Sequence, residues 1–145
     1  MHTRVRTLTD GGLRDGAFVL YWMTSARRPH HNHALDHALT LCAQIGRPLL
    51  VLEPLRIAYP HASRRLHAFV IDGMRDNAQA FAAAKVAYHP YIEPAPGEGR
   101  GLIEALARDA CAVVTDDYPV FFLPRMLDAA AEALDDLGVR LDAVD

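Results

Sequence analysis

The feature that most constrains the fold is a near-continuous apolar and aromatic run over residues 17–23, which reads Ala-Phe-Val-Leu-Tyr-Trp-Met. A strand that is covered on both faces needs such a run, whereas a half-exposed antiparallel strand would alternate apolar with polar residues. Shorter apolar runs return at residues 48–52 and 111–115. These three segments therefore predict buried parallel strands inside an α/β domain.

The segments between and after these runs carry helical periodicity. Asn32 is a candidate N-cap for a helix that ends at Gly46, and Ser63 begins a longer helix that runs to about Lys85. A weaker strand at 86–92 contains Pro90, which cannot donate to a ladder and therefore fits a sheet edge. We further expect helices at 102–109 and 124–137, a last strand at 139–144, and loops at 53–62, 94–101 and 116–123.

Five strands alternating with four helices predict a Rossmann-like α/β fold, with a doubly wound five-stranded parallel sheet in the order 3-2-1-4-5 and helices on both faces. The order reverses between the first and fourth strands. A ligand cleft is therefore expected beyond their carboxyl ends, between the loops at 24–31 and 116–123. Residues 1–16 are polar and rich in glycine, so we expect a poorly ordered lead-in before a domain at 17–145.

Composition limits the class of protein. A chain of 145 residues that is 51% hydrophobic and 23% charged fits one domain with a sizeable core and excludes a disordered or collagen-like protein. No run is long enough to cross a bilayer and residues 1–16 lack the apolar segment of a signal peptide, so we expect a cytoplasmic protein with no membrane partner. Cys42 and Cys111 lie in apolar runs and are interpreted as core thiols in a reducing compartment.

Motifs for common chemistries are missing. The glycine-rich segment 97–101 lacks the spacing of a dinucleotide or phosphate loop, and we interpret it as a flexible connection. His33 and His37 share a helix face, but no cysteine or suitably placed carboxylate completes a ligand set, so no metal site is expected. Neither Ser25 nor Ser63 lies in a nucleophile elbow. The net charge of −3 is also unlike that of an autonomous nucleic-acid binder. The residues predict no catalytic set.

Two groups of side chains follow the strands that flank the expected cleft. Tyr21 and Trp22 end the first strand, where they either stack on a planar ligand or fill the two sides of the sheet. Asp116, Asp117 and Tyr118 follow the fourth strand, where ligand contacts gather in such folds, although Asp is also common in caps and turns. Spacing alone leaves these alternatives open.

At these residues the chain resembles the amino-terminal α/β domain of class II DNA photolyases, in the photolyase/cryptochrome superfamily. The resemblance rests on four blocks that occur in the family's order and that span Phe18 to Val144. The blocks are Tyr21-Trp-Met23 with Arg27-Arg28, Asn32-His-Ala-Leu-Asp36, Arg65-Leu-His67 with Phe69-Val-Ile-Asp-Gly-Met74, and Val113-Val-Thr-Asp116 with Pro124-Arg125.

The resemblance implies a part in light-dependent DNA repair. A complete photolyase is a lyase that uses light-excited reduced FAD to split cyclobutane pyrimidine dimers, and a large helical domain holds the FAD and the lesion. This chain stops where that carboxy-terminal domain would begin. We therefore expect no catalytic residue and no repair by this chain alone. FAD is expected only together with the helical domain, supplied in cis or in trans, and DNA is expected to be contacted only indirectly.

The role that the resemblance implies for the domain itself is to bind an antenna chromophore, which is 8-hydroxy-5-deazaflavin, folate or flavin. The chromophore would lie over the carboxyl ends of the first and fourth strands, with an arginine against its acidic tail. The candidate cofactor-binding residues are Tyr21, Trp22, Met23, Ser25, Arg27, Asn32, Asp116, Tyr118 and Phe121.

Exposed aromatic side chains such as Phe121 and Phe122 would then belong to the surface that packs on the helical domain, and they predict self-association of the lone domain. Two other hypotheses stay open. One is a stand-alone nucleotide- or flavin-binding module similar to universal stress proteins, against which the missing glycine-rich phosphate loop counts. The other is a structural remnant that binds nothing.

Overall fold

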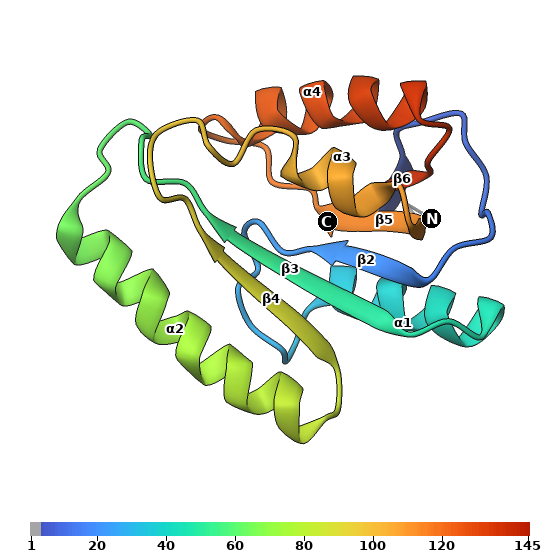
Figure 1. Cartoon of the computed structure of the whole chain (residues 1–145), viewed down its shortest axis with the longest axis horizontal. Helices are drawn as coiled ribbons and strands as arrows, with labels where there is room; N and C mark the ends of the chain where they lie inside the picture. Colours follow the sequence, from blue (N-terminus) through green and yellow to red (C-terminus); the bar gives the residue numbers. More distant parts are fainter. Residues whose placement is uncertain (1–3) are drawn as a thin grey trace.

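The fold is built on a six-stranded sheet with helices on both faces (Figure 1). The computed structural model describes residues 4–145. The elements follow one another along the chain as β1 (Val5–Thr7), β2 (Phe18–Trp22), α1 (His33–Ile45), β3 (Leu49–Leu55), α2 (Arg64–Ala83), β4 (Ala87–Ile92), α3 (Leu102–Ala107), β5 (Ala110–Asp116), α4 (Leu123–Asp136) and β6 (Leu141–Val144).

The strands lie in the order β1-β6-β5-β2-β3-β4. All neighbouring pairs are parallel except β1 with β6, which is antiparallel. The α/β class is confirmed, but the prediction of five strands in a wholly parallel sheet is wrong. The sixth strand, β1, is added at the edge beside β6, so the sheet's count and full order differ from the prediction, while the five expected strands keep the order 3-2-1-4-5. It is short and polar, so it has no apolar pattern by which the sequence could reveal it.

The expectation of a poorly ordered lead-in is also wrong for residues 4–16, which pack along the sheet. The Thr7 hydroxyl donates to the carboxylate of Asp142 at 2.7 Å and so fixes β1 on β6. Gly16 lets the segment before β2 lie close to the start of β5, because a Cβ atom there would lie 2.7 Å from the backbone of Ala110 and Cys111. Gly16, one of the glycines that suggested flexibility, thus allows tight packing.

Strand β2 is buried on both faces, as the apolar run predicts. Val19 and Tyr21 pack in the core under α1 and α2, whereas Leu20 and Trp22 pack in the core under α3 and α4. Figure 1 shows α3 and α4 on one side of the sheet and α1 and α2 on the other. Successive side chains of β2 enter the two cores in turn, so both sets must be apolar. An alternating apolar and polar pattern would bury polar side chains in one of the cores.

The local signals for helix ends are confirmed. The Asn32 side chain accepts a hydrogen bond from the Leu35 N–H at 2.9 Å, and Gly46 ends α1 with φ +66°. Ser63 caps α2 in the same way. No helix within residues 4–145 is long and apolar enough to span a bilayer.

Strand β3 continues through Glu53 to Leu55, where the sequence predicts a loop because of Pro54. The pairing of β2 with β3 ends at Leu52, so Pro54 lies beyond the end of β2 and faces a strand only on the β4 side. A proline is tolerated in a strand where its missing N–H has no partner to lose. Pro90 lies on the edge strand β4, as predicted.

We predict that Val19→Asp abolishes cooperative folding. Val19 is fully buried in β2, an inner strand of the sheet, and an unpaired buried carboxylate costs several kcal/mol, against a total stability of about 5 to 15 kcal/mol. The control is His89→Asp on the exposed face of β4, which should leave folding nearly unchanged. Urea unfolding followed by circular dichroism compares the two, and a cooperative Val19→Asp transition near that of the wild type would refute the placement.

Candidate functional site

The carboxylate of Asp116, the last residue of β5, binds the loop that follows β2. Its Oδ2 atom accepts hydrogen bonds from the backbone N–H groups of Thr24 (2.9 Å), Ser25 (2.7 Å) and Ala26 (2.9 Å). Its Oδ1 atom accepts from the Tyr21 hydroxyl at 2.8 Å. Both oxygens are therefore used within the protein, and the residue is only 7% exposed. Asp116 holds the two loops together at the point where the ligand cleft is expected.

Asn32 completes this network from the start of α1. Its side-chain N–H groups donate to the Tyr21 hydroxyl (2.9 Å) and to the carbonyl oxygens of Ala26 and Arg28 (both 3.0 Å). Burial, and then the charge of Asp116, raise the pKa of Tyr21 above its usual range. Its hydroxyl thus stays protonated, donates to Asp116 and accepts from Asn32. These three side chains shape the loop and lie inside the protein.

A second buried carboxylate, Glu53, anchors the same loop from β3. The Arg27 guanidinium lies 3.2 Å from Glu53 Oε1 and donates to the Pro54 carbonyl at 2.8 Å. The other oxygen, Oε2, accepts from the Asn77 amide (2.8 Å) and the Tyr88 hydroxyl (2.6 Å). Burial, and then donation to Glu53, raise the pKa of Tyr88 above its usual range. Arg27 is therefore committed to a structural ion pair.

A large cleft lies beside the expected position. It has a volume of about 570 Å³ and opens at the carboxyl ends of β2, β3 and β4, next to α3 and α4. The sequence places the cleft between the loops at 24–31 and 116–123, and Thr24, Arg27, Phe122 and Leu123 of these loops line a smaller neighbouring hollow. The residues that line the cleft are Trp22, Leu52, Pro54, Leu55, Arg56, Tyr91, Glu93, Gly97, Gly99, Arg100, Gly101, Leu102, Ile103, Glu104, Phe122, Arg125, Met126, Ala129 and Ala130.

The sequence-derived candidates divide into three groups. Trp22 lines the large cleft, and Arg27 lines a neighbouring hollow of about 170 Å³ that shares several residues with it. Tyr118 and Phe121 are exposed but border neither hollow. The remaining candidates, which are Tyr21, Met23, Ser25, Asn32 and Asp116, belong to the network behind the loop or to the core. The expected aromatic wall from Tyr21 is corrected, since that side chain is fully buried.

Sequence reasoning missed most of the cleft. Tyr91 and the arginines Arg56, Arg100 and Arg125 come from four segments that are distant in sequence, and no motif joins them. Phe122, expected to be exposed, is half-buried: the Arg56 guanidinium lies 5.4 Å from its ring centre. The one available signal was the arginine in the glycine-rich segment 97–101, which we interpreted as a plain connection.

Glu93 fixes that segment against the cleft. Its Oε1 atom accepts from the N–H groups of Gly97 (2.8 Å) and Gly99 (3.3 Å), and its Oε2 atom accepts from Ile57 at 3.1 Å. Burial alone would raise the pKa of Glu93, but these donors and the charge of Arg56 outweigh it and lower the pKa below its ordinary value of 4.5. The connection is thus tied at one end of the cleft rather than free.

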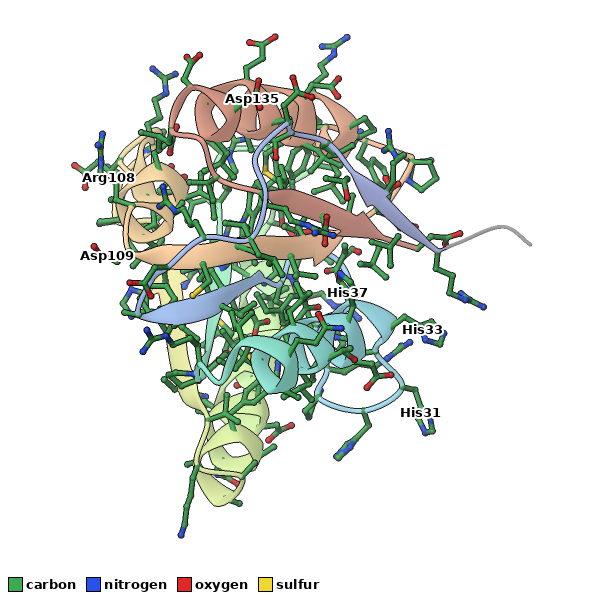
Figure 2. The ribbon with its side chains drawn as sticks, turned by 90° about the vertical axis from the view of Figure 1, so that its right-hand side faces the viewer. His31, His33, His37, Arg108, Asp109 and Asp135 are labelled. Carbon is green, nitrogen blue, oxygen red and sulfur yellow. The ribbon has the colours of Figure 1, made fainter. Side chains whose placement is uncertain are left out.

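The histidines of α1 and the loop before it do not form a ligand set. Figure 2 shows His31 and His33 pointing away from the protein, while His37 lies between α1 and the sheet. The Nε2 atom of His37 is 2.8 Å from the carboxylate of Asp142, which also binds Arg140. Within residues 4–145, no group of three or more His, Cys, Asp or Glu side chains is arranged to hold a metal ion.

We predict that Glu93→Gln lowers stability at neutral pH by about 1 kcal/mol, a modest value because Glu93 lies beside the open cleft. The folded-state pKa lies below the unfolded one, so the stabilisation is complete above about pH 4.5 and is lost as the pH falls through the folded-state pKa. Urea unfolding between pH 7 and pH 3 should show the wild type and variant converging in acid. Glu98→Gln, on the same segment but exposed, is the control, and a pH-independent difference for Glu93→Gln would contradict the assignment.

Comparisons with known proteins agree on one family. No protein-family model matches the chain. A deoxyribodipyrimidine photo-lyase of Methanothermobacter thermautotrophicus is 32% identical over 133 residues, which is 90% of this chain and 29% of that protein. A deoxyribodipyrimidine photo-lyase of Oryza sativa subsp. japonica is 33% identical over 147 residues, or 99% of this chain and 28% of that protein. The chain is therefore a photolyase-family domain, and it spans less than a third of the length of the curated relatives it matches.

Proposed function

We propose that this domain binds an antenna chromophore for a photolyase that repairs cyclobutane pyrimidine dimers in DNA under light. The observation that carries the proposal is the cleft of about 570 Å³ in a domain whose relatives are named deoxyribodipyrimidine photo-lyase. That volume lies within the range of about 300 to 1,000 Å³ that is usual for small-molecule sites. The cleft also opens at the carboxyl ends of parallel strands, where ligands bind in open α/β sheets.

The lining of the cleft suits a planar aromatic ligand with polar edges. Trp22 and Tyr91 offer aromatic surface, and Met126 offers a polarisable thioether beside them. Three arginines, Arg56, Arg100 and Arg125, are also among the lining residues, and guanidinium groups suit carbonyl oxygens or an anionic tail. 8-Hydroxy-5-deazaflavin, folate and flavin all combine a flat heterocycle with such groups.

The network around Asp116 has a supporting part in this proposal. It fixes the loop that follows β2, and Trp22 is the last residue of that strand. Arg27, held by Glu53, lines the neighbouring hollow, which shares Arg56 and Phe122 with the cleft. The sequence-derived candidates therefore act mainly by positioning the cleft.

The proposed partner is the FAD-binding helical domain of a photolyase, in cis or in trans. Light-driven repair is assigned to that partner together with this domain, and DNA would be contacted only indirectly. The surface that we assign to the partner is the loop after β5, where Tyr118 and Val120 are half-exposed and Phe121 is 82% exposed. An aromatic side chain this exposed gains from being covered.

We predict that Ala129→Trp weakens chromophore binding at least tenfold. Ala129 lies on the exposed side of α4 and lines the cleft, so an indole there fills the space without entering the core. Glu132→Trp is the control, because Glu132 is exposed on the same helix and does not line the cleft. Fluorescence titrations with 8-hydroxy-5-deazariboflavin, riboflavin and methenyltetrahydrofolate measure the dissociation constants.

Equal affinity of Ala129→Trp and the wild type would move the site elsewhere. A failure of all three chromophores to bind, together with binding of ATP, would favour the module similar to universal stress proteins. Binding of none of these ligands would favour a domain without a ligand.

We predict that Phe121→Ser reduces self-association of the lone domain. The exposed ring of Phe121 is the apolar group that the partner domain is proposed to cover, and without the partner it should pair with another copy. Phe69→Ser on α2 is the matched control, since Phe69 is also exposed (79%) but lies on another element. Sedimentation velocity at several concentrations compares the variants. Loss of association in Phe69→Ser alone would place the surface on α2.

A further inference from the structure

Glu104, in the first turn of α3, is one of the residues that line the cleft, and one of its carboxylate oxygens is buried without a partner. Among the described residues, its Oε2 atom is buried and has no hydrogen bond, a condition shared only by His67 Nε2. Glu93, which lines the same cleft, has both of its oxygens occupied by backbone donors. A buried acceptor without a donor is costly, so native proteins rarely keep one without a reason.

The fold itself supplies no such reason. Within residues 4–145 no ion pair involves Glu104, although three arginines line the same cleft. One of them, Arg56, is placed over the Phe122 ring instead. The terminal torsion of a glutamate is broad and nearly two-fold, so rotation about this bond can turn either oxygen toward the cleft. The free acceptor of Glu104 is thus available to a molecule that occupies this space.

We propose that Glu104 is a specificity-determining residue that accepts a hydrogen bond from a ring N–H of the bound chromophore. This inference rests on the proposed function. Flavin and deazaflavin rings carry an N–H group between two carbonyl groups, and a pterin ring carries one between a carbonyl and an amino-substituted carbon. Each is a donor of the kind that a carboxylate selects. The cleft places three guanidinium donors among its lining residues for the acceptors of the same ring.

A carboxylate acceptor of this kind selects among ligands by disfavouring those that place no donor opposite it. A ring whose N–H is replaced by N–CH₃ leaves the acceptor unpaired and adds a clash, and a site built for a donor rejects an analogue that lacks it. Glu104 would therefore distinguish these heterocycles from aromatic ligands of similar size that present only acceptors. Trp22 and Tyr91 would contact both kinds of ring equally.

The test compares 8-hydroxy-5-deazariboflavin and riboflavin with their N3-methyl derivatives, titrated against wild type, Glu104→Gln, Glu104→Ala and the exposed control Glu98→Gln. We expect the parent ring that binds to lose about tenfold or more in affinity in both Glu104 variants and none in the control. We expect the N3-methyl derivative to bind weakly to the wild type and no more weakly to the Glu104 variants. Thermal unfolding of each variant checks that the fold is intact.

The outcomes separate this inference from the proposal on which it rests. If a parent ring binds and the Glu104 variants bind it as tightly as the wild type, Glu104 has no part in recognition and the proposed function stands. If the variants weaken the parent and the N3-methyl rings equally, Glu104 acts on the shape of the cleft and the inference is overturned. If neither parent ring binds the wild type, this inference is overturned, and the proposed function fails as well only if methenyltetrahydrofolate does not bind either.

Discussion

The arrangement of the functional edge depends on one carboxylate, that of Asp116. It joins the ends of β5 and β2 by accepting from three successive backbone N–H groups and from the Tyr21 hydroxyl. A buried carboxylate is tolerated only where donors surround it, and here they do. The network fixes the loop after β2, part of which lines the smaller hollow. The large cleft lies beside it, toward β3 and β4.

Two further buried carboxylates act in the same way along this edge of the sheet. Glu53 near the end of β3 and Glu93 just after β4 are also buried, and each ties a neighbouring segment through both oxygens. Burial of these carboxylates is tolerated because each oxygen has a partner. Removing one partner would leave an uncompensated buried charge. Measured against these three, Glu104 is the exception among the acids at this edge, because its buried oxygen lacks a donor. Glu93 lines the same cleft and has both oxygens paired, and this contrast is the reason for assigning a role to the unpaired oxygen of Glu104.

Local signals predicted much of the fold and little of the site. The apolar run of β2 and the caps at Asn32, Gly46 and Ser63 depend on residues close in sequence, and pattern reasoning found them. Strand β1 depends on the bond from Thr7 to Asp142, 135 residues away, which no periodicity reveals. The cleft is likewise lined by residues from three strands (β2, β3 and β4), two helices (α3 and α4) and the loops between them. Asp116 was predicted to contact a ligand, and spacing could not show that its carboxylate faces the protein's own backbone.

Phe121 and Phe122 link the cleft to the surface assigned to a partner domain. Phe121 has φ +62°, a left-handed conformation that costs a non-glycine residue about 1 to 2 kcal/mol. Phe122 lines the cleft beside Arg56, while Phe121 is almost fully exposed. Such strain persists where the surroundings impose it and tends to occur at functional positions. A partner that covers Phe121 would press on the loop that holds Phe122, so docking of the partner and occupation of the cleft would share one short segment of chain.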